Sequence, residues 1–94
     1  MVVAMKKLVK YSKNGYDFEV VRREGDLAIA LGKSRTSKAE SWEVFQVQSH
    51  NGLCIAGVDI PPAEFAPRNE QWGIKGWTAL NEKNAEEIFQ IKKQ

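Results

Sequence analysis

One stretch, residues 61–80, divides this sequence into two parts with different patterns. It holds all three prolines, two of the three tryptophans and two of the seven glycines. Prolines and glycines interrupt helices and strands, so we expect this stretch to be irregular. The residues before it alternate as paired strands do, and the residues after it have helical spacing. The sequence therefore predicts a sheet and a helix, with residues 61–80 joining them and covering the surface that they leave open.

The first hairpin is predicted from Asn14-Gly15, a dipeptide that tolerates positive φ at both central positions of a two-residue turn. A turn there places Tyr11 opposite Phe18 and Lys10 opposite Glu19. One face of the hairpin is then apolar, and the other carries a favourable charge pair.

The second hairpin is predicted to turn at Glu24-Gly25, which places Val20 opposite Ile29 on the apolar face that holds Phe18. A turn at Gly25-Asp26 is the alternative. It shifts the register by two residues in total, so every side chain stays on its face. Both turns therefore predict the same face for these side chains and a central third strand.

The third hairpin is predicted between residues 42–49 and 53–60, with its turn at Asn51-Gly52. This turn places Phe45 opposite Val58 on an apolar face, where Cys54 is expected to be buried. The reverse face begins at Trp42 and is only half polar. Such a face needs cover from the same chain or from a partner.

A C-terminal helix is predicted over residues 82–93. Asn81 can cap it, and Ala85, Ile88 and Phe89 form one apolar stripe at helical spacing. Leu80 is expected to pack on Ala85 as a hydrophobic staple. The predicted fold class is α+β, with a five-stranded antiparallel, meander-like sheet over residues 6–60 and one helix packed on its apolar face. Residues 1–94 are expected to form a single domain.

The composition is typical of a globular protein and not of a secreted or membrane-spanning one. The 94 residues are 43% hydrophobic and 28% charged, which is ordinary for a globular domain. The single cysteine permits neither an internal disulfide nor a cysteine-based metal cluster. The first lysines follow the apolar run at the N-terminus, unlike the charge order of a signal peptide, and no apolar run is long enough to span a bilayer. We expect a cytoplasmic protein that does not enter membranes.

Few residues offer catalytic chemistry. His50, the single histidine, lies beside a predicted turn without a partner at ligand spacing. The fragment Gly32-Lys33-Ser34 lacks the earlier glycine and the following helix that a phosphate-binding loop requires. No spacing brings two carboxylates to a common site. We therefore expect a protein that binds and is not an enzyme, with no cofactor and no metal.

The candidate partner-binding surface combines aromatic and cationic residues within and near the 61–80 stretch. Trp72 and Trp77 alternate with Arg68 and Lys75, and Trp42 begins the half-polar face. Such groups anchor protein interfaces or stack on bases. The alternative is that both tryptophans form a lid over the sheet, in which case Trp77 should be largely buried.

The uneven distribution of charge suggests a second candidate binding surface, which is basic. Residues 1–40 carry nine Lys and Arg and five Asp and Glu, whereas residues 41–94 carry five and seven. The first part has a net charge of +4 and the second of −2. Weak nucleic-acid binding is therefore the alternative function, through the N-terminal strand and the loop at residues 32–41. The residues that would carry it are Lys6, Lys7, Lys10, Lys13, Lys33, Arg35 and Lys38.

The run Asn69-Glu70-Gln71-Trp72-Gly73, followed by Gly76-Trp77-Thr78 and a short terminal helix, loosely resembles small uncharacterised proteins of bacteria and their phages or mobile elements. The resemblance covers roughly residues 66–90. It implies a compact accessory protein and brings no catalytic residues. The sequence thus favours a small non-enzymatic interaction domain whose partner is a protein; it does not indicate an oligomeric state.

Overall fold

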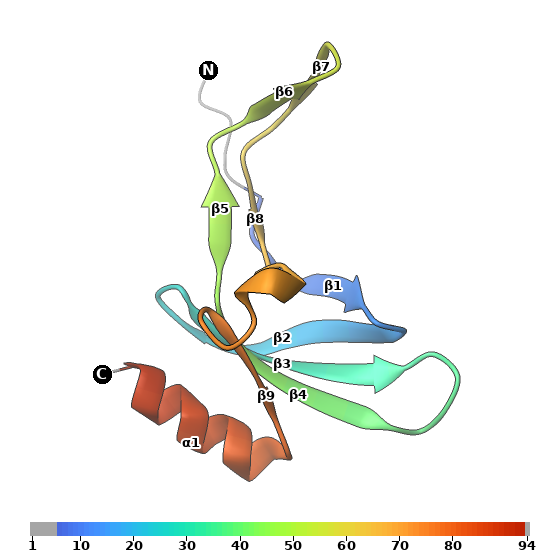
Figure 1. The fold of residues 1–94 in the computed structure, drawn as a ribbon, viewed down its shortest axis with the longest axis vertical. Helices are drawn as coiled ribbons and strands as arrows, with labels where there is room; N and C mark the ends of the chain where they lie inside the picture. Colours follow the sequence, from blue (N-terminus) through green and yellow to red (C-terminus); the bar gives the residue numbers. More distant parts are fainter. Residues whose placement is uncertain (1–5, 94) are drawn as a thin grey trace.

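The computed structural model describes residues 6–93 (Figure 1). A five-stranded antiparallel sheet with the order β1-β2-β3-β4-β9 carries one C-terminal helix, which confirms the predicted α+β class. The sheet and helix consist of β1 (Lys10–Lys13), β2 (Tyr16–Glu24), β3 (Leu27–Ser34), β4 (Glu40–Gln46), β9 (Gly76–Ala79) and α1 (Glu82–Lys93). The remaining elements are β5 (Gln48–His50), β6 (Leu53–Ile55), β7 (Val58–Ile60), β8 (Ala63–Phe65) and the 3-10 helix η1 (Asn69–Gln71).

The first hairpin has the predicted register. Tyr11 lies opposite Phe18, and Lys10 lies opposite Glu19. The turn residue Asn14 has φ 52° and is followed by a glycine with φ 82°. These are the left-handed conformations that the Asn-Gly dipeptide favours.

The second hairpin departs from the predicted face. Its turn is the alternative, Gly25-Asp26, and the register shifts between Val20 and Arg22, so that Val20 lies opposite Ala30. A bulge adds one residue to one strand and moves the following side chains to the other face. Phe18 and Ile29 therefore lie on opposite faces of the sheet, and their predicted common face is wrong.

The predicted third hairpin is also wrong. The fifth strand of the sheet is β9, which pairs with β4 so that Val44 lies opposite Trp77 and Phe45 opposite Gly76. Residues 53–60 turn back on themselves as β6 and β7 and do not pair with β4. The 61–80 stretch, expected to be irregular, thus supplies two strands, β8 and β9.

The core lies on both faces of the sheet. Towards the helix, the buried cluster contains Leu27, Ile29, Val44, Ala79, Ala85 and Phe89. The opposite cluster contains Phe18, Ala28, Ala30, Phe45 and Val47. Alternate residues of β3 enter each cluster, which explains why this central strand is a continuous apolar run.

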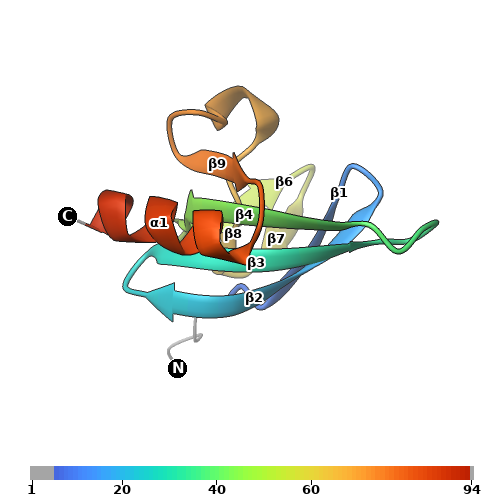
Figure 2. The same ribbon diagram turned by 90° about the horizontal axis from the view of Figure 1, so that it is seen from below.

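The helix has the predicted bounds and packs against β3, β4 and β9 (Figure 2). Asn81 caps it, because its Oδ1 accepts a hydrogen bond from the Asn84 N–H at 2.8 Å. Ala85 and Phe89 are fully buried, as the apolar stripe predicts. The staple is wrong: Leu80 is 91% exposed, while its N–H donates to Asn84 Oδ1 at 3.0 Å.

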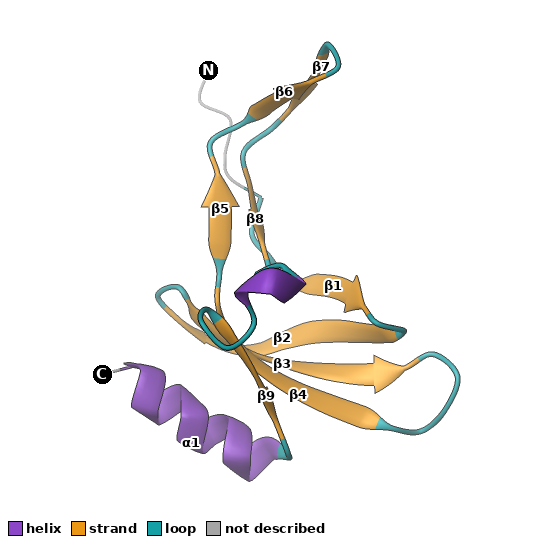
Figure 3. Cartoon of the chain, viewed as in Figure 1, coloured by secondary structure: helices purple, strands orange, loops and turns teal. Residues whose placement is uncertain are grey.

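An arm stands out from this body (Figures 1 and 3). Its base is the antiparallel pair β5 and β8, and its tip is the two-stranded pair β6 and β7. We call residues 53–60 the ribbon. Among residues 6–93, no helix is long and apolar enough to cross a membrane.

Candidate functional site

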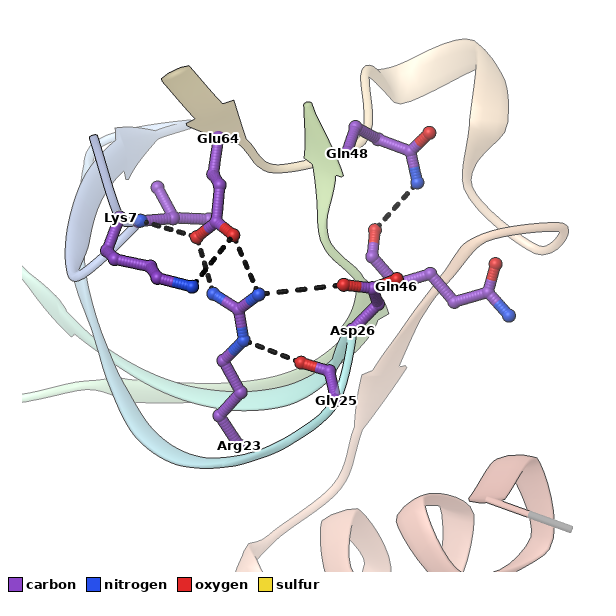
Figure 4. A network of polar contacts seen from close by, with 8 residues as sticks. Lys7, Arg23, Gly25, Asp26, Gln46, Gln48 and Glu64 are labelled. Carbon is purple, nitrogen blue, oxygen red and sulfur yellow. Dashed lines mark hydrogen bonds and ion pairs between the residues drawn. The ribbon is translucent and has the colours of Figure 1, made fainter. Parts of the chain in front are cut away.

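The base of the arm is fixed by a polar network around Glu64 (Figure 4). Both carboxylate oxygens accept hydrogen bonds from the Arg23 guanidinium, one of them at 2.8 Å, and one also accepts from the Leu8 N–H at 2.9 Å. The Lys7 ammonium lies 3.8 Å away. The Glu64 side chain is only 6% exposed, and hydrogen bonding to Arg23 is the main cause that lowers its pKa to about 2.

The network joins three segments that are distant in the sequence. Glu64 belongs to β8, and Arg23 belongs to β2 next to its turn, where its Nε donates to the Gly25 carbonyl. The backbone of Lys6 runs parallel to β8, donating to the Pro62 carbonyl at 3.1 Å and accepting from the Glu64 N–H at 2.9 Å. The arm is therefore tied to the main sheet by ion pairs and by backbone hydrogen bonds.

The ribbon at the tip is amphipathic. Leu53 lies opposite Ile60, and Ile55 lies opposite Val58, so these four aliphatic side chains share one face. We call them the apolar face of the ribbon. Leu53, Ile55 and Val58 are 46, 56 and 63% exposed, and Ile60 is half-buried.

The opposite face of the ribbon holds Cys54 and Asp59. Cys54 is exposed, so its predicted burial in the core is wrong, as is that of Val58. The turn between the strands is formed by Ala56 with φ 50° and Gly57 with φ 80°. The sequence predicts Leu53 and Ile55 on the half-polar reverse face and Val58 and Ile60 on the core face, because Asn51-Gly52 is a stronger turn signal than Ala56-Gly57. It therefore does not predict that these four residues share one face.

Trp72 covers the sheet on the face opposite the helix. Its ring lies so close to Gly76 that a Cβ added to this glycine would be 2.3 Å from the indole. Its Nε1 donates to the Thr78 hydroxyl at 2.9 Å, and the Lys13 ammonium lies 3.3 Å from the ring centroid. Trp72 is half-buried against the cluster of Phe45, which matches the lid interpretation for this residue.

Trp77 and Trp42 lie on the helix side of the sheet. Both are half-buried against the cluster that contains Phe89, and the Lys92 ammonium lies 4.4 Å from the Trp77 ring centroid. Trp77 is therefore less buried than the sequence predicts. It is part of strand β9, so it is not a lid residue.

The structure separates the five candidate partner-binding residues. Trp42 and Trp77 lie on one face of the sheet and Trp72 on the other. Arg68 is exposed at the start of η1, and Lys75 is half-buried with its Nζ donating to Gln48 Oε1 at 3.4 Å. These side chains do not converge on one aromatic and cationic surface.

A second polar network surrounds Glu43, which is 5% exposed. The Tyr11 hydroxyl donates to one carboxylate oxygen at 2.8 Å, and the Lys13 ammonium lies 3.2 Å from the other. Burial, followed by the charge of Glu43 and this hydrogen bond, raises the pKa of Tyr11. Throughout residues 6–93, each buried side-chain nitrogen or oxygen has a hydrogen-bond partner. The network is therefore a satisfied structural element.

Four of the seven candidate nucleic-acid-binding residues form ion pairs with carboxylates. Lys7 pairs with Glu64, Lys10 with Glu19, Lys13 with Glu43 and Arg35 with Asp17, at distances of 3.8, 3.8, 3.2 and 3.0 Å. The other three are Lys6 at the base of the arm, Lys33 in β3 and Lys38 in the loop before β4.

One hollow and the single histidine are two further places in the described residues where polar groups gather. A shallow hollow of about 690 Å³ lies over β1, β2 and β3, and its charged rim is the paired Lys10 and Glu19 together with Asp17 and Lys33. The His50 Nδ1 accepts the Gly52 N–H at 3.2 Å. Within residues 6–93, no group of three His, Cys, Asp or Glu side chains could hold a metal ion.

Comparison of the chain with protein-family models, with curated proteins and with solved structures found no match.

Proposed function

We propose that this chain is a non-enzymatic protein-interaction domain that contacts its partner through the apolar face of the ribbon. The observation that supports the proposal is an aliphatic face that is roughly half exposed at the tip of an arm fixed to the body. A two-stranded hairpin alone is marginally stable in water, and it needs packing on one face. A partner protein would supply that packing.

The ribbon is favoured over the tryptophans because of what each can offer a partner. Trp72 is engaged by Lys13, Thr78 and the backbone at Gly76, and Trp77 packs under the helix. Only part of each ring is available. By contrast, Leu53, Ile55 and Val58 of the ribbon are each roughly half exposed. Exposed aliphatic patches on a small domain commonly mark contact sites.

Site-specific photocrosslinking tests this proposal in cells. A photoreactive amino acid at Val58 should form a covalent adduct with another protein molecule, because this side chain is 63% exposed on the apolar face of the ribbon. Ile91, which is 64% exposed on the helix, is the matched control position.

An adduct from position 58 and none from position 91 supports the proposal. If neither position gives an adduct, or if both give the same adducts, the ribbon is not the contact surface.

A further inference from the structure

We propose that the partner of the ribbon is a second copy of this chain, with two ribbons packed apolar face to apolar face about a two-fold axis. This inference rests on the proposed function, since it assumes that the apolar face of the ribbon is a protein contact. In such a contact the same residues are buried on both copies. Two ribbons would form a small two-layer sandwich of four strands, with layers about 10 Å apart.

The distribution of charge on the ribbon allows two copies to meet without like-charge repulsion. Asp59 is its single charged residue and lies on the face opposite Leu53, Ile55 and Val58. When two apolar faces meet, the two Asp59 carboxylates point away from the contact, so no like charges are brought together. No polar side chain is left unpaired within the contact either, and an unpaired polar group would be costly there.

The apolar face of the ribbon lacks the side chains that usually make binding selective for one particular partner protein. The side chains that contribute most to selective binding at protein interfaces are often Trp, Tyr or Arg. The four residues of this face are Leu53, Ile55, Val58 and Ile60, and they include none of these types. An aliphatic surface without hydrogen-bonding side chains matches a surface of the same kind, and the ribbon of a second copy is one.

The shape of the molecule leaves room for this contact. The radius of gyration is 14.4 Å, against about 12 Å for a compact domain of this length. The arm extends away from the main sheet and from the helix (Figures 1 and 3). Two tips can therefore meet while the bodies stay apart.

The contact area is small, because three exposed side chains and one half-buried side chain form the face. It falls at the low end of the range for protein interfaces, where association is weak and transient. We therefore expect a weak and reversible dimer, because contacts of that size associate weakly.

Sedimentation velocity over a range of protein concentrations tests the inference on the purified chain. The unmodified protein should shift from monomer towards dimer as its concentration rises. Ile55→Lys should weaken the association at least tenfold, because it places a charge in the contact. Ile91→Lys, at an equally exposed apolar position on the helix, should leave the dimer unchanged. Asp59→Lys, on the opposite face of the ribbon, should also leave it unchanged.

Cysteine crosslinking tests which face is buried. In a Cys54→Ser background, Ile55→Cys or Val58→Cys should be joined between copies by a short bismaleimide. The native Cys54 should not be joined, because it lies on the outer face of the ribbon. Crosslinking through Cys54 but through neither introduced cysteine would overturn the face-to-face arrangement.

A chain that stays monomeric at several hundred micromolar would overturn the inference. So would a dimer that Ile55→Lys leaves intact. The proposed function would survive either result if the photoreactive group at position 58 joined the chain to a different protein. Failure of the inference and failure of the proposed function are therefore distinguishable.

Discussion

At the scale of single residues, Gly76 is one of two glycines at which an aromatic ring occupies the space of a side chain; the other is Gly32. The indole of Trp72 occupies this space at Gly76, and a Cβ at Gly76 would be 2.3 Å from it. Gly76→Ala must displace the ring, and it should destabilise the fold by about 1–3 kcal/mol, the usual cost of overpacking. Urea unfolding measures this cost. Thr78→Val, which removes only the exposed hydrogen bond to the same indole, should cost less; the reverse order would contradict the packing argument.

Glu64 gives the stability of the fold a predictable dependence on pH. Its pKa in the folded protein, about 2, lies below the ordinary value of 4.5. The stabilisation is therefore complete above about pH 5 and is lost as the pH falls from the unfolded pKa towards 2. Its upper limit is on the order of 3 kcal/mol, since one pKa unit corresponds to about 1.4 kcal/mol.

Glu64→Gln should accordingly lower the free energy of unfolding at pH 7 by much more than at pH 2.5. Urea titrations of both proteins across this range measure the difference. Glu19→Gln is the control, because the Glu19 side chain is 59% exposed and its ion pair with Lys10 should contribute little. A difference for Glu64→Gln that is the same at every pH would show that the carboxylate charge is unimportant.

Trp42 and Trp77 allow a matched comparison on the helix side of the sheet. The lid interpretation of residues 61–80 predicts that Trp77 is the more costly to remove, because it would then be largely buried. Both are half-buried in the same cluster, so Trp42→Ala and Trp77→Ala should each cost about 2 kcal/mol, roughly half the usual cost for a buried tryptophan. Thermal unfolding of the two variants tests this. A much larger loss for Trp77→Ala would restore the sequence-based expectation.

At the scale of elements, the local signals that correctly predict structure are those with no distant competitor. The Asn14-Gly15 turn and the Asn81 cap act within a few residues, and both are formed. The prediction at Asn51-Gly52 fails because β4 pairs with β9, about 30 residues further along the chain. That pairing places Trp77 beside Val44 under the helix, and a local turn signal contains no information about it.

The apolar face of the ribbon could not be predicted from the sequence, because it too depends on the distant pairing of β4 with β9. Alternating apolar residues, such as Leu53 and Ile55 or Val58 and Ile60, have the same sequence pattern in a core strand and in an exposed ribbon. Which of the two occurs depends on where β4 finds its partner. The bulge near Val20 is likewise absent from the pattern of apolar residues, although it decides the face on which Phe18 lies.

The turn of the ribbon provides a test at this scale. Ala56 and Gly57 adopt φ 50° and 80°, close to the values of Asn14 and Gly15 in the first hairpin. Alanine is strained in this region and asparagine tolerates it, so Ala56→Asn should stabilise the ribbon by a few tenths to about 1 kcal/mol. Amide hydrogen exchange in residues 53–60 should slow. Asn14→Ala should have the opposite effect on the first hairpin; faster exchange in the Ala56→Asn ribbon would contradict the assigned turn.

At the scale of the whole molecule, the fold brings the two oppositely charged parts of the sequence together. Carboxylates from the second part pair with cations of the first: Glu43 with Lys13, Glu64 with Lys7 and Arg23, and Glu86 with Arg22. The charge difference of +4 against −2 is thus largely compensated within the structure. Nucleic-acid binding through phosphate contacts requires free basic side chains, and two of the candidate cations, Lys7 and Lys13, are paired with these carboxylates.

These ion pairs predict that the chain binds nucleic acid weakly or not at all. Non-specific nucleic-acid binding usually has dissociation constants of about 10⁻⁴ to 10⁻⁶ M at physiological salt, and it weakens as salt rises because phosphate contacts release counterions. With four of its seven candidate cations paired, this chain should give no change in fluorescence anisotropy with labelled single- or double-stranded oligonucleotides up to about 50 μM protein at that salt. The double variant Glu43→Gln and Asp17→Asn, which frees Lys13 and Arg35, is the informative comparison. Binding that appears only in this variant would show that the ion pairs suppress it, whereas salt-sensitive binding by the unmodified chain at low micromolar concentration would make the nucleic-acid hypothesis the better account of the basic strands.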